Sequence, residues 1–89
     1  MGGLDIAGRY HFIGIGGAGM SVVAELLASR GASVSGSDRA DSPVLERLRG
    51  MGITVFAGHD AAHVPADAVV VVSTAIRESN PELAAARGR

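Results

Sequence analysis

Short runs of apolar, β-forming residues alternate with amphipathic stretches along this chain. The stretches between the runs repeat their apolar side chains at helical spacing, as Met20, Val23 and Leu27 do, and therefore predict helices. Gly31 follows the first such stretch, where a helix-ending glycine belongs. The expected strands are residues 10–15, 33–38, 53–56 and 68–73, and the expected helices are residues 20–30, 42–51 and a last one opened by Asn80, with a short helical turn at 60–64.

Strand and helix alternate at a spacing that favours parallel strands joined by right-handed crossovers. The expected fold class is therefore α/β: a Rossmann-like doubly wound parallel sheet of about four strands, in the order 3-2-1-4, with helices on both faces. Residues 69–72 are four consecutive valines, a pattern expected of a strand that is covered on both faces. We expect one domain over residues 1–89. Because a helix in this pattern should feed another strand, we also expect a fragment of a larger protein.

Composition narrows the possible partners and chemistry. The formal net charge is −1 and no block of like charge occurs, which argues against nucleic acid or an anionic membrane as a partner. The longest apolar run, residues 68–72, is far shorter than the roughly 20 residues of a membrane span. The absence of Cys excludes a thiol nucleophile and a Cys-ligated metal. All basic residues are Arg, so the lysine of an ATP-binding P-loop is missing.

Residues 14–19 read Gly-Ile-Gly-Gly-Ala-Gly and match the pattern G-x-G-x-x-G between an expected strand and an expected helix. Gly14 would allow a tight turn, Gly16 would let the backbone approach a phosphate, and Gly19 would let the helix pack close to the sheet. The N–H groups of residues 17–21 would be unpaired and would point at an anion. A glycine-rich turn that binds nothing is the alternative. The candidate phosphate-binding residues are Gly16, Gly17, Ala18, Gly19, Met20 and Ser21.

Further candidates follow the carboxyl ends of the other expected strands. Asp38 ends the second strand, where an acid hydrogen-bonds a ribose hydroxyl in dinucleotide-binding folds; an ordinary turn acid is the alternative. Residues 73–76 follow the fourth strand at the topological switch point, where ligands bind such sheets, although a capped loop would explain them equally well. His59 could reach the same ligand or be a loop residue without function. His11 is expected to be packed and His63 to lie in a surface turn, and no two histidines are spaced as metal ligands, so no metal site is expected.

The sequence around these candidates resembles UDP-N-acetylmuramate–L-alanine ligases, which belong to the Mur ligase family. The resemblance begins near Arg9 and covers nearly the whole chain. Its most specific part is His-Phe-Ile-Gly-Ile-Gly-Gly-Ala-Gly-Met-Ser at residues 11–21, a run rarely seen in dehydrogenases. The match continues at residues 34–38 (Val-Ser-Gly-Ser-Asp), 58–59 (Gly-His), 72–76 (Val-Ser-Thr-Ala-Ile) and 80–83 (Asn-Pro-Glu-Leu).

This resemblance implies a role in peptidoglycan precursor synthesis, and so in cell wall biogenesis, in the bacterial cytoplasm. Ligases of this kind join L-alanine to the lactyl carboxylate of UDP-N-acetylmuramate and consume ATP through an acyl phosphate. The first of their three domains holds the UDP part of the substrate, the central domain binds ATP and magnesium, and the last helps to bind the amino acid. This chain resembles the first domain. Its expected partners are therefore UDP-N-acetylmuramate and the central ATP-binding domain of the same enzyme.

Carried onto this chain, the resemblance assigns ligand contacts to one crevice. The backbone of residues 16–21 would hold the diphosphate, while Ser37, Asp38 and Arg39 would contact the uridine. The sites for ATP and magnesium have no counterpart here, so we expect no catalytic residue, no cofactor in the fragment, and binding without turnover. The residues that would line the same crevice are His59, Ser73, Thr74, Ala75 and Ile76.

Three other interpretations use the same motif. An NAD-binding domain of an oxidoreductase would share the glycine loop and the acid, but Met20, Ser21 and residues 73–76 resemble the ligases instead. A regulatory nucleotide-sensing module would bind a nucleotide with no enzyme attached. The ligase that recycles murein tripeptide onto the same UDP sugar is the nearest alternative, and the glycine loop at residues 17–20 favours the alanine ligase over it.

Overall fold

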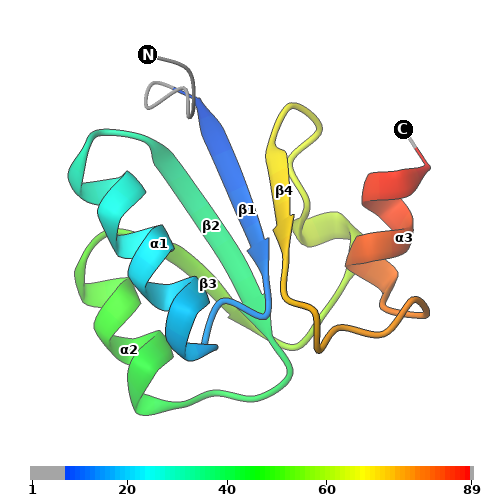
Figure 1. The fold of residues 1–89 in the computed structure, drawn as a ribbon, viewed down its shortest axis with the longest axis horizontal. Coiled ribbons are helices and arrows are strands. Elements are labelled where there is room, and N and C mark those ends of the chain that lie inside the picture. The colour runs from blue at the N-terminus through cyan, green and yellow to red at the C-terminus, as the bar shows by residue number, and fades with distance from the viewer. Residues whose placement is uncertain (1–7, 89) are drawn as a thin grey trace.

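The computed structural model describes residues 8–88. Four parallel strands form one sheet in it (Figure 1). The strand order is β3-β2-β1-β4, which confirms the predicted fold class and strand order. The termini of the predicted domain, residues 1–7 and 89, lie outside the described residues. The elements are β1 (Arg9–Ile13), α1 (Ala18–Ser29), β2 (Ser33–Asp38), α2 (Pro43–Gly50), β3 (Thr54–Ala57), the 3-10 helix η1 (Ala61–His63), β4 (Val69–Val72) and α3 (Pro81–Arg87).

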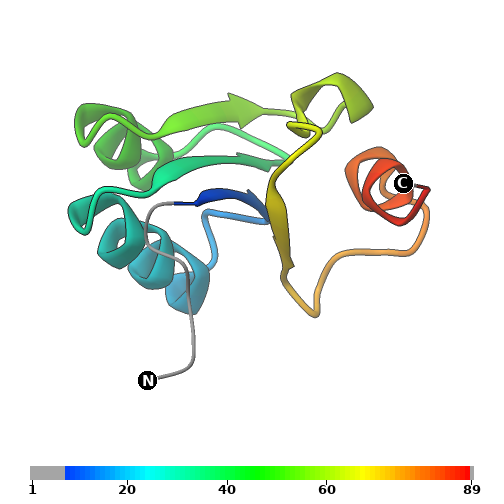
Figure 2. The ribbon, with the colours of Figure 1, turned by 90° about the horizontal axis from the view of Figure 1, so that it is seen from above.

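Helices cover both faces of the sheet, as predicted. Figure 2 shows α3 and η1 on the side of the sheet away from α1 and α2. The apolar core lies on the α1 and α2 side, because alternate residues of each strand, such as Tyr10 and Phe12 of β1, point that way. None of these helices is long and apolar enough to cross a lipid bilayer, as judged over residues 8–88.

Two expectations about burial were wrong. The strand β4 lies at an edge of the sheet, as the predicted order requires, but its side chains are not fully covered on both faces: Val69 is 56% exposed and the other three valines are only partly buried. Its valines are apolar, yet only Val71 packs against the core on the α1 side. On the predicted apolar face of α1, Ala24 and Leu27 are buried as expected, but Val23 is 41% exposed, and Ser21 is buried with them.

N-cap side chains mark where the helices α2 and α3 begin. The hydroxyl of Ser42 accepts a hydrogen bond from the Leu45 N–H at 3.3 Å, so Ser42 caps α2 as predicted. The side-chain oxygen of Asn80 likewise accepts from the N–H groups of Glu82 (2.8 Å) and Leu83 (3.3 Å) and caps α3. The first strand stops at Ile13, two residues earlier than expected, because the chain turns at Gly14 with a φ of 87°.

The close approach that the fold requires lies at Gly36 and not at Gly19. The N–H groups of Gly14 and Ile15 both donate to the Ser37 carbonyl oxygen, at 2.8 and 3.0 Å, which lays Ile15 directly on β2. A Cβ atom added at Gly36 would stand 2.5 Å from Ile15 Cδ1 and 2.8 Å from the Phe12 carbonyl oxygen. A Cβ atom at Gly19 would meet nothing within 4 Å, so the packing role expected of Gly19 was wrong.

A buried polar layer occupies the other face of the sheet, beneath α3. Its centre is Glu82, whose side chain is fully buried. Its Oε1 accepts hydrogen bonds from His11 Nε2 at 2.6 Å and from the Ser37 hydroxyl at 2.7 Å. Its Oε2 accepts from the Asp60 N–H and from His63 Nδ1, each at 3.1 Å. A carboxylate offers about four lone-pair sites, and all of them are filled here.

These hydrogen bonds decide the charge of Glu82. Burial raises the pKa of the carboxyl group, but the hydrogen bonds from His11, Ser37, Asp60 and His63 outweigh burial and lower that pKa from 4.5 to about 2. The carboxylate is therefore ionised at neutral pH. The Glu82 side chain thereby joins β1, β2 and the segment around η1 to α3. Every buried side-chain nitrogen and oxygen atom in the described chain has a hydrogen-bond partner.

Replacing Gly36 by Ala should destabilise the fold by roughly 1–3 kcal/mol, because the added methyl group collides with backbone as well as with Ile15. Gly50→Ala is the matched control: a Cβ atom there meets nothing within 4 Å, and alanine at the end of a helix should be neutral or slightly stabilising. Urea unfolding of the variants measures both effects. Equal stability of the two variants would contradict the close approach at Gly36.

The stability of the fold should fall as the pH is lowered from 4.5 toward 2. The unfolded Glu82 carboxyl group takes up a proton at its ordinary pKa of 4.5, and the folded one only at about 2. The full contribution, about 3 kcal/mol for such a shift, is present above the unfolded pKa and is lost as the pH falls through the folded pKa. Glu82→Gln should be less stable at neutral pH and should lose most of this dependence in urea unfolding measured across the acid range.

Glu46→Gln is the control for this experiment, because the Glu46 side chain is 75% exposed. Asp41, whose pKa is lowered chiefly by its hydrogen bond from Arg49, gives every variant an acid dependence of the same sign. The difference between Glu82→Gln and the unsubstituted chain therefore isolates Glu82. An acid dependence that persists unchanged in Glu82→Gln would show that this carboxylate is not its source.

Candidate functional site

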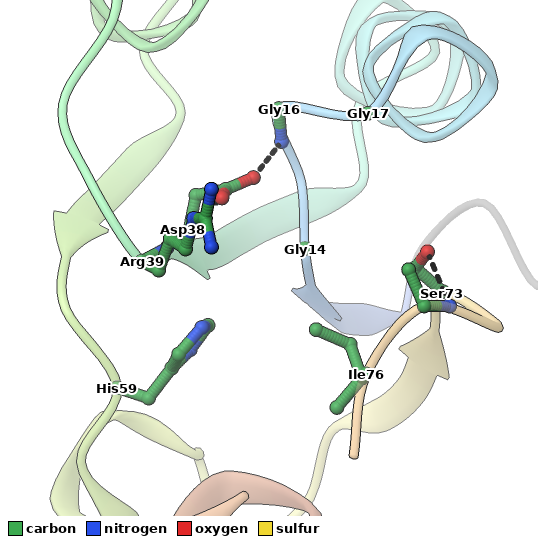
Figure 3. A pocket seen from close by; sticks show the side chains of 9 residues that line it. Gly14, Gly16, Gly17, Asp38, Arg39, His59, Ser73 and Ile76 are labelled. Atoms are coloured by element: carbon green, nitrogen blue, oxygen red, sulfur yellow. Dashed lines mark hydrogen bonds between the residues drawn. The ribbon is translucent and has the colours of Figure 1, made fainter.

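A cleft of about 520 Å³ opens at the carboxyl ends of the strands (Figure 3). It lies where β1 separates β2 from β4, which is the switch point predicted to bind a ligand. Figure 3 shows His59 and Ile76 projecting from opposite sides into the space beside the glycine loop. The lining residues are Gly14, Gly16, Gly17, Asp38, Arg39, His59, Ser73, Ala75 and Ile76.

The glycine loop is largely hydrogen-bonded within the chain itself. The Gly16 N–H donates to Asp38 Oδ2 at 2.8 Å, and the Gly17 N–H donates to the Gly14 carbonyl oxygen at 3.1 Å. The Ser21 N–H donates to the Gly17 carbonyl oxygen at 2.9 Å and begins the helical pattern. The expectation that all N–H groups of residues 17–21 are unpaired was therefore wrong. The Gly17 N–H is used by the turn, and the Ser21 N–H is used by the first helical hydrogen bond.

Three donors remain at the start of α1. The N–H groups of Ala18, Gly19 and Met20 have no acceptor within the described part of the chain. Gly17 caps the helix without a side-chain bond, and the first turn contains no acidic residue. The positive end of this 12-residue helix thus faces outward with its donors open, an arrangement suited to an anion. These three residues lie beside the cleft and do not line it.

Asp38 and Arg39 form the side of the cleft that follows β2. Asp38 Oδ2 accepts from the Gly16 N–H, and Oδ1 accepts from the Arg39 N–H at 2.9 Å. Each carboxylate oxygen keeps a further lone pair for a ligand donor. The Arg39 side chain forms no ion pair with any described residue, so its guanidinium group is available at the cleft. The acid thus combines two functions, holding the glycine loop and offering an acceptor.

The loop after β4 forms the opposite side. The Ser73 N–H continues the pairing with β1 by donating to the Ile13 carbonyl oxygen at 3.2 Å, and the Ile76 N–H closes a turn on the Ser73 carbonyl oxygen at 3.0 Å. A Cβ atom at Gly14 would lie 3.1 Å from Ser73 Cβ and 3.3 Å from Ile76 Cδ1. The two loops therefore pack against each other, and Ile76 supplies an apolar surface to the cleft.

Not every predicted site residue reaches the cleft. Ser37 is buried beneath it, and its hydroxyl group is bonded to Glu82 and His59. Ser21 is also buried and donates to the Ala18 carbonyl oxygen at 3.2 Å. Thr74 is exposed and is not among the lining residues. For these residues, and for the others assigned to ligand contact, the binding role stays a prediction.

The sequence-based prediction missed Glu82 as a structural partner of the site. Asn80-Pro81-Glu82 indicates a helix start, and nothing in that pattern shows that the acid is buried under the cleft. The prediction also missed a side cavity of about 330 Å³, which shares Arg39 and His59 with the main cleft and continues toward Arg77. Three histidines surround Glu82, yet the described residues contain no group of acids and histidines arranged to hold a metal ion.

The sequence matches the model of the Mur ligase family, catalytic domain, over residues 9–89. It is 58% identical over 81 residues to a UDP-N-acetylmuramate–L-alanine ligase of Azoarcus sp. (strain BH72), a match that covers 91% of this chain and 17% of the relative. It is 62% identical over 76 residues to the ligase of the same name from Streptomyces coelicolor, covering 84% of this chain and 16% of the relative. The chain thus spans about a sixth of the length of these curated relatives.

Solved structures agree with these relatives. The crystal structure of a UDP-N-acetylmuramate-alanine ligase from Thermotoga maritima superposes with a TM-score of 0.86 at 39% identity, over 90% of this chain and 19% of that one. A murein peptide ligase from Psychrobacter arcticus 273-4 superposes with a TM-score of 0.74 at 34% identity, over 80% of this chain and 15% of that one. The glycine loop, the strand order and these matches together show that the chain belongs to the Mur ligase family.

Proposed function

We propose that this chain is the UDP-binding domain of a ligase that adds L-alanine to UDP-N-acetylmuramate in peptidoglycan precursor synthesis. The observation that carries the proposal is the cleft at the switch point, where the glycine loop, Asp38 and His59 meet the loop after β4, which contributes Ser73, Ala75 and Ile76. The relatives described above, at 58% and 62% identity, bear the name of that ligase. The murein peptide ligase shares the fold at lower identity and lower TM-score, so the alanine ligase is the better supported of the two.

The diphosphate of the ligand would bind at the start of α1. The open N–H groups of Ala18, Gly19 and Met20 supply donors, and the helix dipole favours negative charge there. Arg39 adds a positive side chain on the other side of the cleft. The Asp38 carboxylate already accepts hydrogen bonds from the N–H groups of Gly16 and Arg39. These two bonds would offset part of its repulsion of the phosphates.

The nucleoside would occupy the cleft itself. Asp38 offers an acceptor for a hydroxyl or N–H group, and Ile76 offers an apolar surface against which a base or sugar ring can pack. The muramoyl part would then extend out of the cleft, and the side cavity near Arg77 gives one direction for it. These contacts all use groups that lie within the described chain.

The chemistry of ligation would require more than this chain provides. In the proposed enzyme, ATP and magnesium would bind to a central domain, which would meet this domain across the bound substrate in the cytoplasm. The chain contains no lysine, and its glycine motif has Met20 at the position of the P-loop lysine. The residues present therefore do not fit an ATP site, and we assign them to binding alone.

The chain should bind uridine nucleotides in preference to adenine nucleotides. An amide chemical-shift titration with UDP, UDP-N-acetylmuramate, ADP and NAD measures this directly. Shifts concentrated at residues 16–21, around Asp38 and at residues 73–76 are expected for the uridine ligands, because these segments border the cleft and the open helix end. Tighter binding of NAD than of UDP would instead favour an oxidoreductase.

Replacing Gly16 by Val should abolish binding of the UDP ligand while the fold survives. A Cβ atom at Gly16 would stand 2.7 Å from Asp38 Oδ2, so the larger side chain must push this carboxylate away from both the loop and the cleft. Gly50→Val is the control, because a Cβ atom there meets nothing within 4 Å and Gly50 does not line the cleft. Calorimetric titration with UDP compares the variants, and unchanged affinity in Gly16→Val would refute the assignment of the loop.

A further inference from the structure

His59 stands between the cleft and the buried polar layer. It lines both the main cleft and the side cavity, and its side chain is 15% exposed. Its Nδ1 atom lies 2.8 Å from the Ser37 hydroxyl oxygen and 3.5 Å from Glu82 Oε2. Its Nε2 atom has no partner within the described chain. One ring nitrogen is thus bound from beneath, and the other is left for a ligand. Figure 3 shows the His59 ring projecting into the cleft.

The protons of this arrangement can be assigned from chemistry alone. A hydroxyl group has one proton to donate, and Ser37 donates it to Glu82 Oε1 at 2.7 Å. Toward His59 the Ser37 oxygen can then act only as an acceptor, so Nδ1 must be the donor. The second neighbour of Nδ1, the Glu82 carboxylate, is also an acceptor. In the neutral imidazole, a proton on Nδ1 leaves Nε2 without one.

We infer that Glu82, acting through Ser37, is a positioning residue that holds His59 in the tautomer with its proton on Nδ1, and thereby makes Nε2 a hydrogen-bond acceptor for a donor group of the ligand. Only the identity of that ligand rests on the proposed function. In a uridine nucleotide the donor is either the imide N–H of the base or a ribose hydroxyl. The cleft then presents acceptors on His59 and Asp38 and a cation on Arg39, a set that selects ligands by their donors as well as by charge.

The tautomer can be measured without any ligand. Long-range proton–nitrogen correlation spectra of the imidazole rings, recorded at about pH 8 where unperturbed imidazole is neutral, distinguish a protonated nitrogen from an unprotonated one. The unsubstituted chain should show His59 with a protonated Nδ1 and an unprotonated Nε2. Protonation of Nε2 in this spectrum would overturn the inference outright.

Two variants test the relay. In Ser37→Ala the acceptor at 2.8 Å is lost. In Glu82→Gln a neutral amide replaces the carboxylate that accepts the Ser37 proton and lies 3.5 Å from Nδ1, so the acceptors that favour a proton on Nδ1 are weakened. Both changes should shift His59 toward the other tautomer or a mixture of the two. Glu25→Gln is the control, since Glu25 lies on α1 and pairs with Arg47 at the surface. If Glu82→Gln fails to fold, Ser37→Ala decides; a folded Ser37→Ala chain with the His59 signature unchanged would overturn the relay.

Ligand analogues then identify the donor. Affinities of UDP, 3-methyl-UDP, 2′-deoxy-UDP and 3′-deoxy-UDP are compared by calorimetric titration with the unsubstituted chain and with His59→Ala. The analogue that lacks the relevant donor should bind roughly five- to tenfold more weakly than UDP, and this deficit should largely vanish in His59→Ala. Analogues that all bind as tightly as UDP would overturn the acceptor role of Nε2. Failure of UDP itself to bind would instead refute the proposed function and leave the tautomer result standing.

Discussion

A buried carboxylate must be surrounded by donors or lose its charge, and in this chain that requirement organises one whole face of the sheet. Glu82 gathers donors from β1, β2, the N-cap of η1 and η1 itself. Apolar contact alone could not specify this arrangement, because β4 is half-buried and α3 is only a short helix. The directionality of the hydrogen bonds fixes where α3 lies, and the position of α3 fixes the segment that carries His59.

The two sides of the cleft are consequently built by different means. On the glycine side the groups are backbone donors, held in place by a turn at Gly14 and by the Asp38 carboxylate. On the His59 side the group is a side chain, held by a relay that begins at a residue outside the cleft. Backbone donors suit a diphosphate group, because that group is the same in every nucleoside diphosphate. A side-chain acceptor, in contrast, can discriminate between nucleosides.

Much of this could be predicted from sequence, because the relevant rules are local. The caps at Ser42 and Asn80, the glycine turns and the position of the cleft follow from residue type, spacing and the handedness of crossovers. The contacts that escaped prediction join residues far apart in the chain. Spacing along one segment could not reveal that Ile15 rests on Gly36, or that Glu82 pairs with His11. For the same reason the run of four valines, which suggested a strand covered on both faces, could not show that Val69 is exposed.

The hydrogen bond between His11 and Glu82 spans 71 positions, and this separation has a consequence for how the site comes into being. Closing a loop of that length is slow and entropically unfavourable compared with forming the neighbouring βα unit. The glycine side needs only residues up to Asp38 and can take shape early, as a local unit. The His59 side is completed only when α3 docks onto the sheet. The proposed nucleoside subsite should therefore assemble late in folding, and the proposed phosphate subsite can form before it.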